Sequence, residues 1–125
     1  MWAISAIAQL RLNVSMDASP CPRNARGCTD PDGTIRLRPG RSASALAQTT
    51  VHETVHFYLN SIGIEYGWPH EVVAHTVGYY FYNQLPASLQ DDRTLSFWAK
   101  KLQADPITAL SEICQGGYAH LGCQE

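Results

Sequence analysis

The sequence has little net charge, no long apolar run and no repeats, and these absences exclude several classes of protein. Its 125 residues carry a net charge of −2, which gives no general electrostatic reason to bind nucleic acid or an anionic membrane. The apolar N-terminal stretch MWAISAIAQLRL is too short to span a bilayer, and no basic region precedes it. We therefore expect a single globular domain over residues 1–125, without a membrane partner or a processed export signal.

Cysteine is present, but without the spacing of a structural zinc site. The four cysteines form two close pairs, Cys21/Cys28 and Cys114/Cys123, whereas zinc ligands of one pair are usually about two to four residues apart. The pattern leaves free thiols, two disulfides or a second metal open, in this order for a cytosolic protein. We expect the cytoplasm because no export signal is visible, and the cysteine pairs leave secretion open.

The charge is unevenly distributed along the chain. Residues 23–41, here called the arginine segment, have a net charge of +3 and leave −5 for the remainder. The segment contains two acids, Asp30 and Asp32, and five basic residues: Arg23, Arg26, Arg36, Arg38 and Arg41. The pattern is typical of a solvated loop and strand face, and it is also consistent with a wall that attracts an acidic or phosphate-bearing substrate.

Periodicity and capping signals predict an α+β domain, with a small antiparallel or mixed sheet followed by helices. Residues 9–16 and 34–38 alternate apolar and polar side chains and are predicted strands, and residues 18–33 between them are rich in turn-forming residues and are predicted loop. Capping residues such as Ser42, Pro69, Asp105 and the stop at Gly63 predict helices over residues 42–62, 69–84, 94–102 and 105–117.

The first predicted helix carries a metal-binding motif. His52, Glu53 and His56 form the pattern His-Glu-x-x-His, which places both imidazoles on one helix face. Zinc held by three protein ligands keeps a position for water and lowers the pKa of that water. Glu53 lies beside the ligands and can accept the proton of the water as a general base.

The second predicted helix offers candidates for the third ligand. Glu71 lies fifteen residues after His56, and a chain reversal between them allows the two helices to pack antiparallel. We prefer Glu71 because a carboxylate completes a set of two histidines and one carboxylate. His75, one turn later, is the alternative, either as ligand, as partner of a ligand or as a catalytic hydrogen-bond donor. His70 ranks last and is expected to be exposed near the helix start.

Two other families that use this motif do not fit. A metzincin would need glycine at position 59 and histidine at position 62, where this chain has Leu59 and Ile62. A peptide deformylase would need an upstream cysteine ligand in its own motif, whereas Cys28 lies in a loop rich in Pro, Asn and Gly.

The stretches TIRLRPG, SALAQTTVHETVHFYL and HEVVAHTVGYYFYNQL together resemble the small, minimal-scaffold gluzincin-type zinc metallopeptidases (minigluzincins and phage-borne relatives). The resemblance covers about two-fifths of the chain, from Thr34 to Leu85. It implies a zincin-like fold, zinc ligands His52, His56 and Glu71, and Glu53 as the base. It also implies that Thr34 to Arg38 form an edge strand that pairs with an extended peptide substrate.

The remaining polar and aromatic candidates have a structural interpretation that we prefer. Tyrosines and tryptophans near the motif are expected to pack, although a tyrosine could stabilise an oxyanion and Tyr66 or Trp68 could line a cleft. Glu112 is expected to be a solvated carboxylate rather than a partner of a ligand, and His120 or Cys123 could plug the metal site. The aromatic and leucine side chains that we expect to pack against other side chains are Tyr66, Trp68, Tyr79, Tyr80, Tyr82, Leu95, Trp98 and Leu102.

The sequence thus predicts a monomeric zinc metalloendopeptidase with catalytic Glu53 and His75. A zincin-fold binding module that uses its arginine segment for a protein or nucleic-acid partner is the alternative. A helical interaction protein without metal is a third class.

Overall fold

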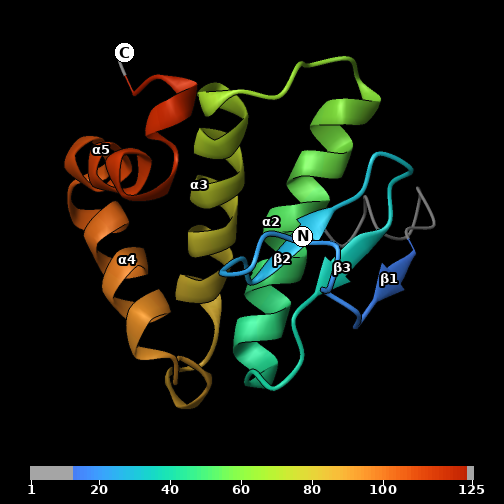
Figure 1. Ribbon diagram of the computed structural model, residues 1–125. Coiled ribbons are helices and arrows are strands. Elements are labelled where there is room, and N and C mark those ends of the chain that lie inside the picture. Colours follow the sequence, from blue (N-terminus) through green and yellow to red (C-terminus); the bar gives the residue numbers. More distant parts are fainter. Residues whose placement is uncertain (1–12, 124–125) are drawn as a thin grey trace.

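The computed structural model describes residues 13–123, and these residues form an α+β fold (Figure 1). A small mixed sheet comes first and helices follow, which confirms the predicted class. The strands are β1 (Val14–Ser15), β2 (Gly27–Thr29) and β3 (Ile35–Leu37). The helices are α2 (Ala43–Ser61), α3 (Trp68–Gln84), α4 (Arg93–Ala104) and α5 (Pro106–Gly117), with 3₁₀ turns η1 (Ala87–Leu89) and η2 (Ala119–Leu121).

The sheet corrects two expectations. Its strand order is β1-β3-β2, with β3 parallel to β1 and antiparallel to β2, so the segment from Thr34 to Arg38 contains the central strand and not an edge strand. The edge strands are β1 and β2, and β2 lies in the segment that was expected to be a loop. Of the predicted strand over residues 9–16, residues 9–12 lie outside the described part, and the rest contains β1.

Strand β2 escapes prediction because its residues, Gly-Cys-Thr, have no apolar alternation. Its position depends instead on pairing with β3 and on packing against α2. A Cβ atom added to Gly27 would meet the carbonyl oxygen of Arg36 at 2.5 Å and a methyl group of Thr49 at 2.9 Å. Glycine at this position therefore allows β2 to lie close to both β3 and the helix.

The helix ends follow the capping signals. The side-chain oxygen of Ser42 accepts from the N–H of Ala45 at 3.2 Å, and Asp105 accepts from the N–H of Thr108 at 3.3 Å. Gly63 has a φ of 85°, the left-handed conformation expected of a residue that ends a helix. The predicted helices are thus confirmed, with differences of one to two residues at most ends.

Helix α2 lies between the sheet and α3, while α4 packs on the other side of α3 and α5 packs against α4 (Figure 1). Tyr82, Leu95 and Leu102 are buried among the helices, as expected, while Trp98 is partly buried against them. Tyr80, in contrast, is 63% exposed. This packing holds α2 and α3, which carry the predicted metal ligands, in one fixed orientation. None of the described helices is long and apolar enough to cross a membrane.

Candidate metal centre

Three predicted ligand atoms meet between α2 and α3. The Nε2 atoms of His52 and His56 lie 3.2 Å apart, and the Oε1 atom of Glu71 lies 3.3 Å from the first and 3.2 Å from the second. His52 and His56 are one helical turn apart on α2, and Glu71 is in the first turn of α3. These residues form a group that could hold a metal ion.

The spacing of the three atoms fits a tetrahedral ion. Metal–ligand bonds of about 2.0–2.2 Å at tetrahedral angles place the ligand atoms about 3.3–3.5 Å apart. All three observed separations lie close to that range. Two imidazoles and a carboxylate are also the ligand set of many catalytic zinc sites.

Two of the three ligands, His56 and Glu71, have a further hydrogen-bond partner that orients them. The Nδ1 atom of His56 lies 2.6 Å from Nδ1 of His70, and the two rings stack with centroids 4.8 Å apart. The hydroxyl of Tyr66 donates to Oε2 of Glu71 at 2.6 Å. Partners of this kind fix the ring orientation of a ligating histidine and strengthen its binding to metal.

The expectation that His70 is exposed is wrong. His70 is only 1% exposed, because the first turn of α3 faces α2 and carries its ring into the interface between the two helices. Sequence spacing alone cannot show this, since the crossing of α2 and α3 decides which side of the first turn is covered.

The electrostatics keep Glu71 ionised. Burial raises the pKa of Glu71, but the hydrogen bonds and charges of His52 and His56 outweigh it and lower the pKa well below its usual range. Burial and the neighbouring Glu71 raise the pKa of Tyr66, so its hydroxyl stays protonated and donates. A buried carboxylate that stays charged beside two imidazoles is suited to bind a cation.

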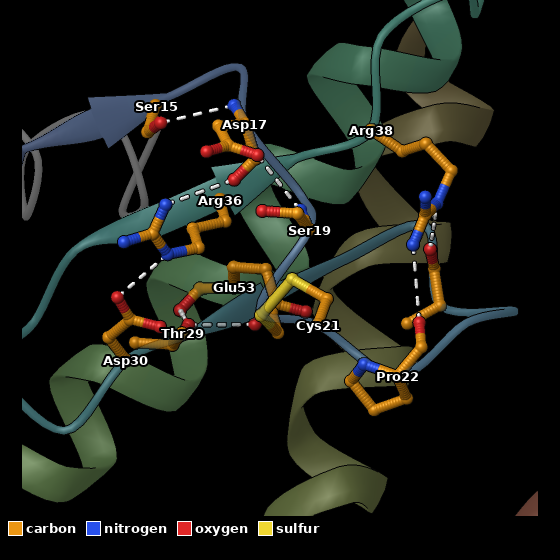
Figure 2. Close-up of a disulfide and its surroundings, with 12 residues drawn as sticks. Ser15, Asp17, Ser19, Cys21, Pro22, Thr29, Asp30, Arg36, Arg38 and Glu53 are labelled. Carbon is orange, nitrogen blue, oxygen red and sulfur yellow. Dashed lines mark hydrogen bonds and ion pairs between the residues drawn. A yellow bond between two sulfur atoms is a disulfide. The ribbon is translucent and has the colours of Figure 1, made fainter.

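Glu53, the predicted base, is 7% exposed and is held by the edge strand. Its Oε1 atom accepts from the hydroxyl of Thr29 on β2 at 2.7 Å, as Figure 2 shows. The same hydroxyl lies 3.3 Å from the carbonyl oxygen of Glu53. The carboxylate therefore has a defined position beside His52 without belonging to the three-atom group.

His75 lies next to the ligands but outside the group of three. Its Nε2 atom is 3.5 Å from Oε1 of Glu71 and 3.1 Å from the hydroxyl of Tyr118, and its Nδ1 atom is buried without a partner among the described residues. Burial, together with the nearby His52, lowers the pKa of His75 to about 3, so the ring is neutral at ordinary pH. Tyr118 was not predicted, because the tail after α5 has no periodicity; only its place between two cysteines sets it apart.

The metal group opens onto a cleft with two parts. The metal compartment has a volume of about 460 Å³ and is lined by the ligands, Tyr66 and the outer end of β2. The arginine compartment has a volume of about 270 Å³ and is lined by residues that include Arg26, Gln48, Tyr79 and Trp98. Both compartments are bordered by Ala25, Gly27, His52, Glu53 and Tyr118.

Two disulfides close the loops that form the cleft walls. Cys21–Cys28 closes the loop before β2, and Cys114–Cys123 closes the turn that carries Tyr118. Arg38 also fixes the first loop by donating to the carbonyl oxygens of Ala25 and Pro22 (Figure 2). The pairing was left open by the sequence, and the described residues contain no free cysteine.

The remaining candidates lie away from the metal centre. Cys123 is in a disulfide and so cannot supply a thiolate to the metal, and His120 is exposed on η2. Glu112 pairs with Lys101 on the surface, as expected of a solvated carboxylate. The tail-plug hypothesis is therefore wrong for Cys123.

Comparison with known proteins adds no further constraint: no family model, no curated protein and no solved structure matches this chain. The resemblance to small gluzincin-type enzymes stays a prediction. A functional conclusion must therefore depend on the geometry of the three ligand atoms and the cleft beside them.

Proposed function

We propose that this chain is a zinc-dependent hydrolase that cleaves peptide bonds with a metal-activated water. The observation that supports it best is the triangle of His52 Nε2, His56 Nε2 and Glu71 Oε1, with Glu53 at the boundary of both compartments. Zinc bound there would lower the pKa of a water molecule and polarise the substrate carbonyl.

The side chains around the group have distinct roles in this proposal. Glu53 accepts the proton of the attacking water and delivers it to the leaving amine, while Thr29 keeps its carboxylate in place. Tyr118, hydrogen-bonded to His75, offers a hydroxyl to the oxyanion that develops on the carbonyl oxygen. Burial raises the pKa of Tyr118, so the hydroxyl keeps its proton for this task.

The substrate strand in this proposal is β2 in place of β3. At the two ends of β3, the carbonyl oxygen of Arg26 accepts from the N–H of Arg38, and the N–H of Asp30 donates to the carbonyl oxygen of Thr34. The alternating residues Gly27 and Thr29 therefore direct their N–H and C=O groups away from β3. Gly27 borders both compartments. An extended peptide would pair with these free groups and pass in front of Glu53.

We infer further that the protein works in an oxidising compartment, although the sequence led us to expect the cytoplasm. Both cysteine pairs are disulfide-bonded, and disulfides persist mainly outside the reducing cytosol. Mass measurement of the protein isolated from its source, with and without reduction and thiol labelling, tests this: four blocked cysteines before reduction support it, and four reactive thiols contradict it.

The metal content of purified protein tests the proposal most directly. We expect one zinc per chain, lost in Glu71→Ala and retained in His75→Ala, because His75 lies outside the group of three. His120→Ala is the matched control for loss of a histidine, since His120 is exposed and lies outside the group of three. No zinc in the wild-type protein after addition of zinc, or loss with His75→Ala but not with Glu71→Ala, contradicts the proposed site.

Glu53→Gln separates a catalytic zinc from a structural one. The variant should keep its zinc and lose about 10²–10⁴-fold in hydrolysis of a peptide library, because the amide cannot accept the proton of the water. Equal hydrolysis by the variant would contradict the role of Glu53. Zinc binding without hydrolysis in the wild-type protein favours a silent binding module.

A further inference from the structure

The arginine segment divides into arginines with internal partners and arginines without them. Three of its five arginines bind other groups of the protein through their guanidinium groups and thereby stabilise the fold. They are Arg36, which pairs with Asp30 at 2.7 Å; Arg38, which donates to two loop carbonyls; and Arg41, which pairs with Asp92 at 3.0 Å. Arg23 is exposed and Arg26 is half-buried, and the side chain of neither makes a hydrogen bond or an ion pair within residues 13–123.

Arg26 is different from Arg23 because it lines the arginine compartment. Burial and the charge of Asp92 raise the pKa of the Tyr79 hydroxyl, and the positive charge of Arg26 opposes that rise. The charge of Arg26 also lowers the pKa of Asp92, but the ion pair of Asp92 is with Arg41. A half-buried guanidinium has five N–H donors and loses part of its hydration, so Arg26, which has no side-chain ion pair among the described residues, can bind an anionic ligand.

A second polar group faces the same space. Gln48 on α2 is only 4% exposed, and its side-chain amide has no hydrogen-bond partner among the described residues. It lines the arginine compartment and lies against Gly78, where a Cβ atom would be 2.8 Å from the amide nitrogen. Buried amides normally have partners, so an unpartnered one beside a cleft indicates that a ligand or water supplies them.

Arg26 is the only arginine or lysine among the described residues that line the compartment. The carboxylate that lines it, Glu53, lies at the end shared with the metal compartment and accepts from Thr29, and the Glu53→Gln variant used below removes its charge. A phosphate dianion would need a second cation, whereas a carboxylate is matched by one guanidinium.

We propose that the arginine compartment binds a carboxylate of the peptide substrate through the guanidinium of Arg26, with the Gln48 amide as a second donor. The inference rests on the proposed peptidase function, and it makes the enzyme selective for an acidic group beside the scissile bond. With about 270 Å³, the compartment is smaller than the pockets of about 300–1,000 Å³ that hold whole small ligands, so it suits one side chain or a chain end. The carboxylate can belong to an Asp or Glu side chain or to the C-terminus of a peptide.

Peptide binding to zinc-loaded Glu53→Gln protein tests the proposal without turnover. Three alanine-based heptapeptides serve as probes: a blocked one with a central Glu, a blocked one with a central Gln, and the Gln peptide with a free C-terminal carboxylate. Trp98 lines the compartment, and its indole N–H signal reports binding by nuclear magnetic resonance, with Trp98→Phe to assign that signal. Arg26→Gln and Arg26→Lys are compared with Arg23→Gln, a matched control in the same disulfide-closed loop.

We expect one of the two carboxylate peptides to bind about tenfold more tightly than the blocked Gln peptide, as for a charge-assisted hydrogen bond. This preference should fall below about twofold in Arg26→Gln, persist in part in Arg26→Lys and stay unchanged in Arg23→Gln. If the Glu peptide binds more tightly, the compartment holds an acidic side chain of the substrate. If the peptide with the free C-terminal carboxylate binds more tightly, the compartment holds the C-terminus of the substrate.

Equal binding of all three peptides, or a preference that survives in Arg26→Gln, overturns the inference. Failure of the proposed function is visible separately, because zinc content and hydrolysis are measured on the wild-type protein. If the chain holds no zinc, the same titration on zinc-free wild-type protein decides whether the compartment binds carboxylate.

Discussion

The two compartments of the cleft differ in how their polar groups are occupied. In the metal compartment, His56, Glu71 and Glu53 all have protein partners at fixed distances, from His70, Tyr66 and Thr29 in turn. In the arginine compartment, Arg26 and Gln48 have none among the described residues. Side chains with hydrogen-bond partners in the protein are kept in fixed positions, whereas side chains without such partners are available to bind a ligand. The four predictions below test this difference, beginning with the largest expected effect.

Removing the Cys114–Cys123 disulfide should disturb a wall that both compartments share. We expect Cys114→Ser with Cys123→Ser to lower the free energy of unfolding by about 2–3 kcal/mol, because a loop of this length then gains freedom in the unfolded chain. Urea denaturation followed by circular dichroism measures it. Cys21→Ser with Cys28→Ser opens a loop of similar length and is the matched comparison, since it disturbs the wall that carries Arg26. Unchanged stability in both variants would contradict the disulfides.

The contact between His56 and His70 should matter for the metal compartment alone. We expect His70→Ala to weaken zinc binding about 10- to 100-fold, because the ring of His56 loses the partner that orients it. Competition with a chelating dye measures the affinity, and His120→Ala controls for removal of a histidine. Zinc affinity equal to that of the wild-type protein would show that His56 needs no such partner. Peptide preference in the arginine compartment should be unaffected.

Loss of the hydrogen bond between Thr29 and Glu53 should reduce activity without loss of metal. We expect Thr29→Val to lower the rate of peptide hydrolysis about five- to tenfold, since the carboxylate is less well positioned. Thr29→Ser keeps the hydroxyl and should restore most of the rate. An unchanged zinc content in both variants distinguishes this effect from damage to the ligands, and a rate equal to wild type in Thr29→Val would refute it.

The smallest effect concerns α4, which supplies Thr94 and Trp98 to the arginine compartment. Burial raises the pKa of Asp92, but the N–H of Leu95 and the charges of Arg26 and Arg41 lower it overall. A carboxyl whose pKa is lowered by folding stabilises the fold above its unfolded pKa of about 3.9, and that stability is lost as the pH falls through the lower folded value.

Asp92→Asn should therefore be less stable than the wild-type protein at pH 7, by less than about 1 kcal/mol because water screens a partly exposed charge, and the gap should close as the pH falls below about 4. Thermal unfolding between pH 2 and pH 7 measures both proteins. Asparagine can still cap α4, so the variant isolates the charge from the cap. A gap that stays constant across this range would contradict the assignment.

Local signals were sufficient for much of the helical structure. Ser42, Asp105 and Gly63 mark helix ends because capping depends on a few neighbouring residues, and the structure confirms each of them. The motif of His52, Glu53 and His56 also predicted two ligand atoms on one face of a helix, since helical spacing is a local property. The zincin-like fold, zinc itself and catalysis stay predictions.

Non-local contacts decided the rest. Strand β2 exists because β3 and α2 provide its neighbours, and its three residues show no alternation that could reveal it. The edge position consequently moved from the segment after Thr34 to Gly27–Thr29. Tyr118 reaches His75 across 43 positions of sequence, which no periodicity could indicate.

The sequence by itself determined the α+β order of elements, the ends of the helices and the placement of His52 and His56 on one face, because these depend on neighbours a few residues away. Only the tertiary structure decided that His70 is buried and that Arg26, alone among the arginines of its segment, lines the cleft with a side chain that makes no hydrogen bond or ion pair within residues 13–123. The physical reason is that burial and charge pairing depend on how segments distant in the sequence pack together. The local sequence pattern of a segment is compatible with more than one such packing arrangement.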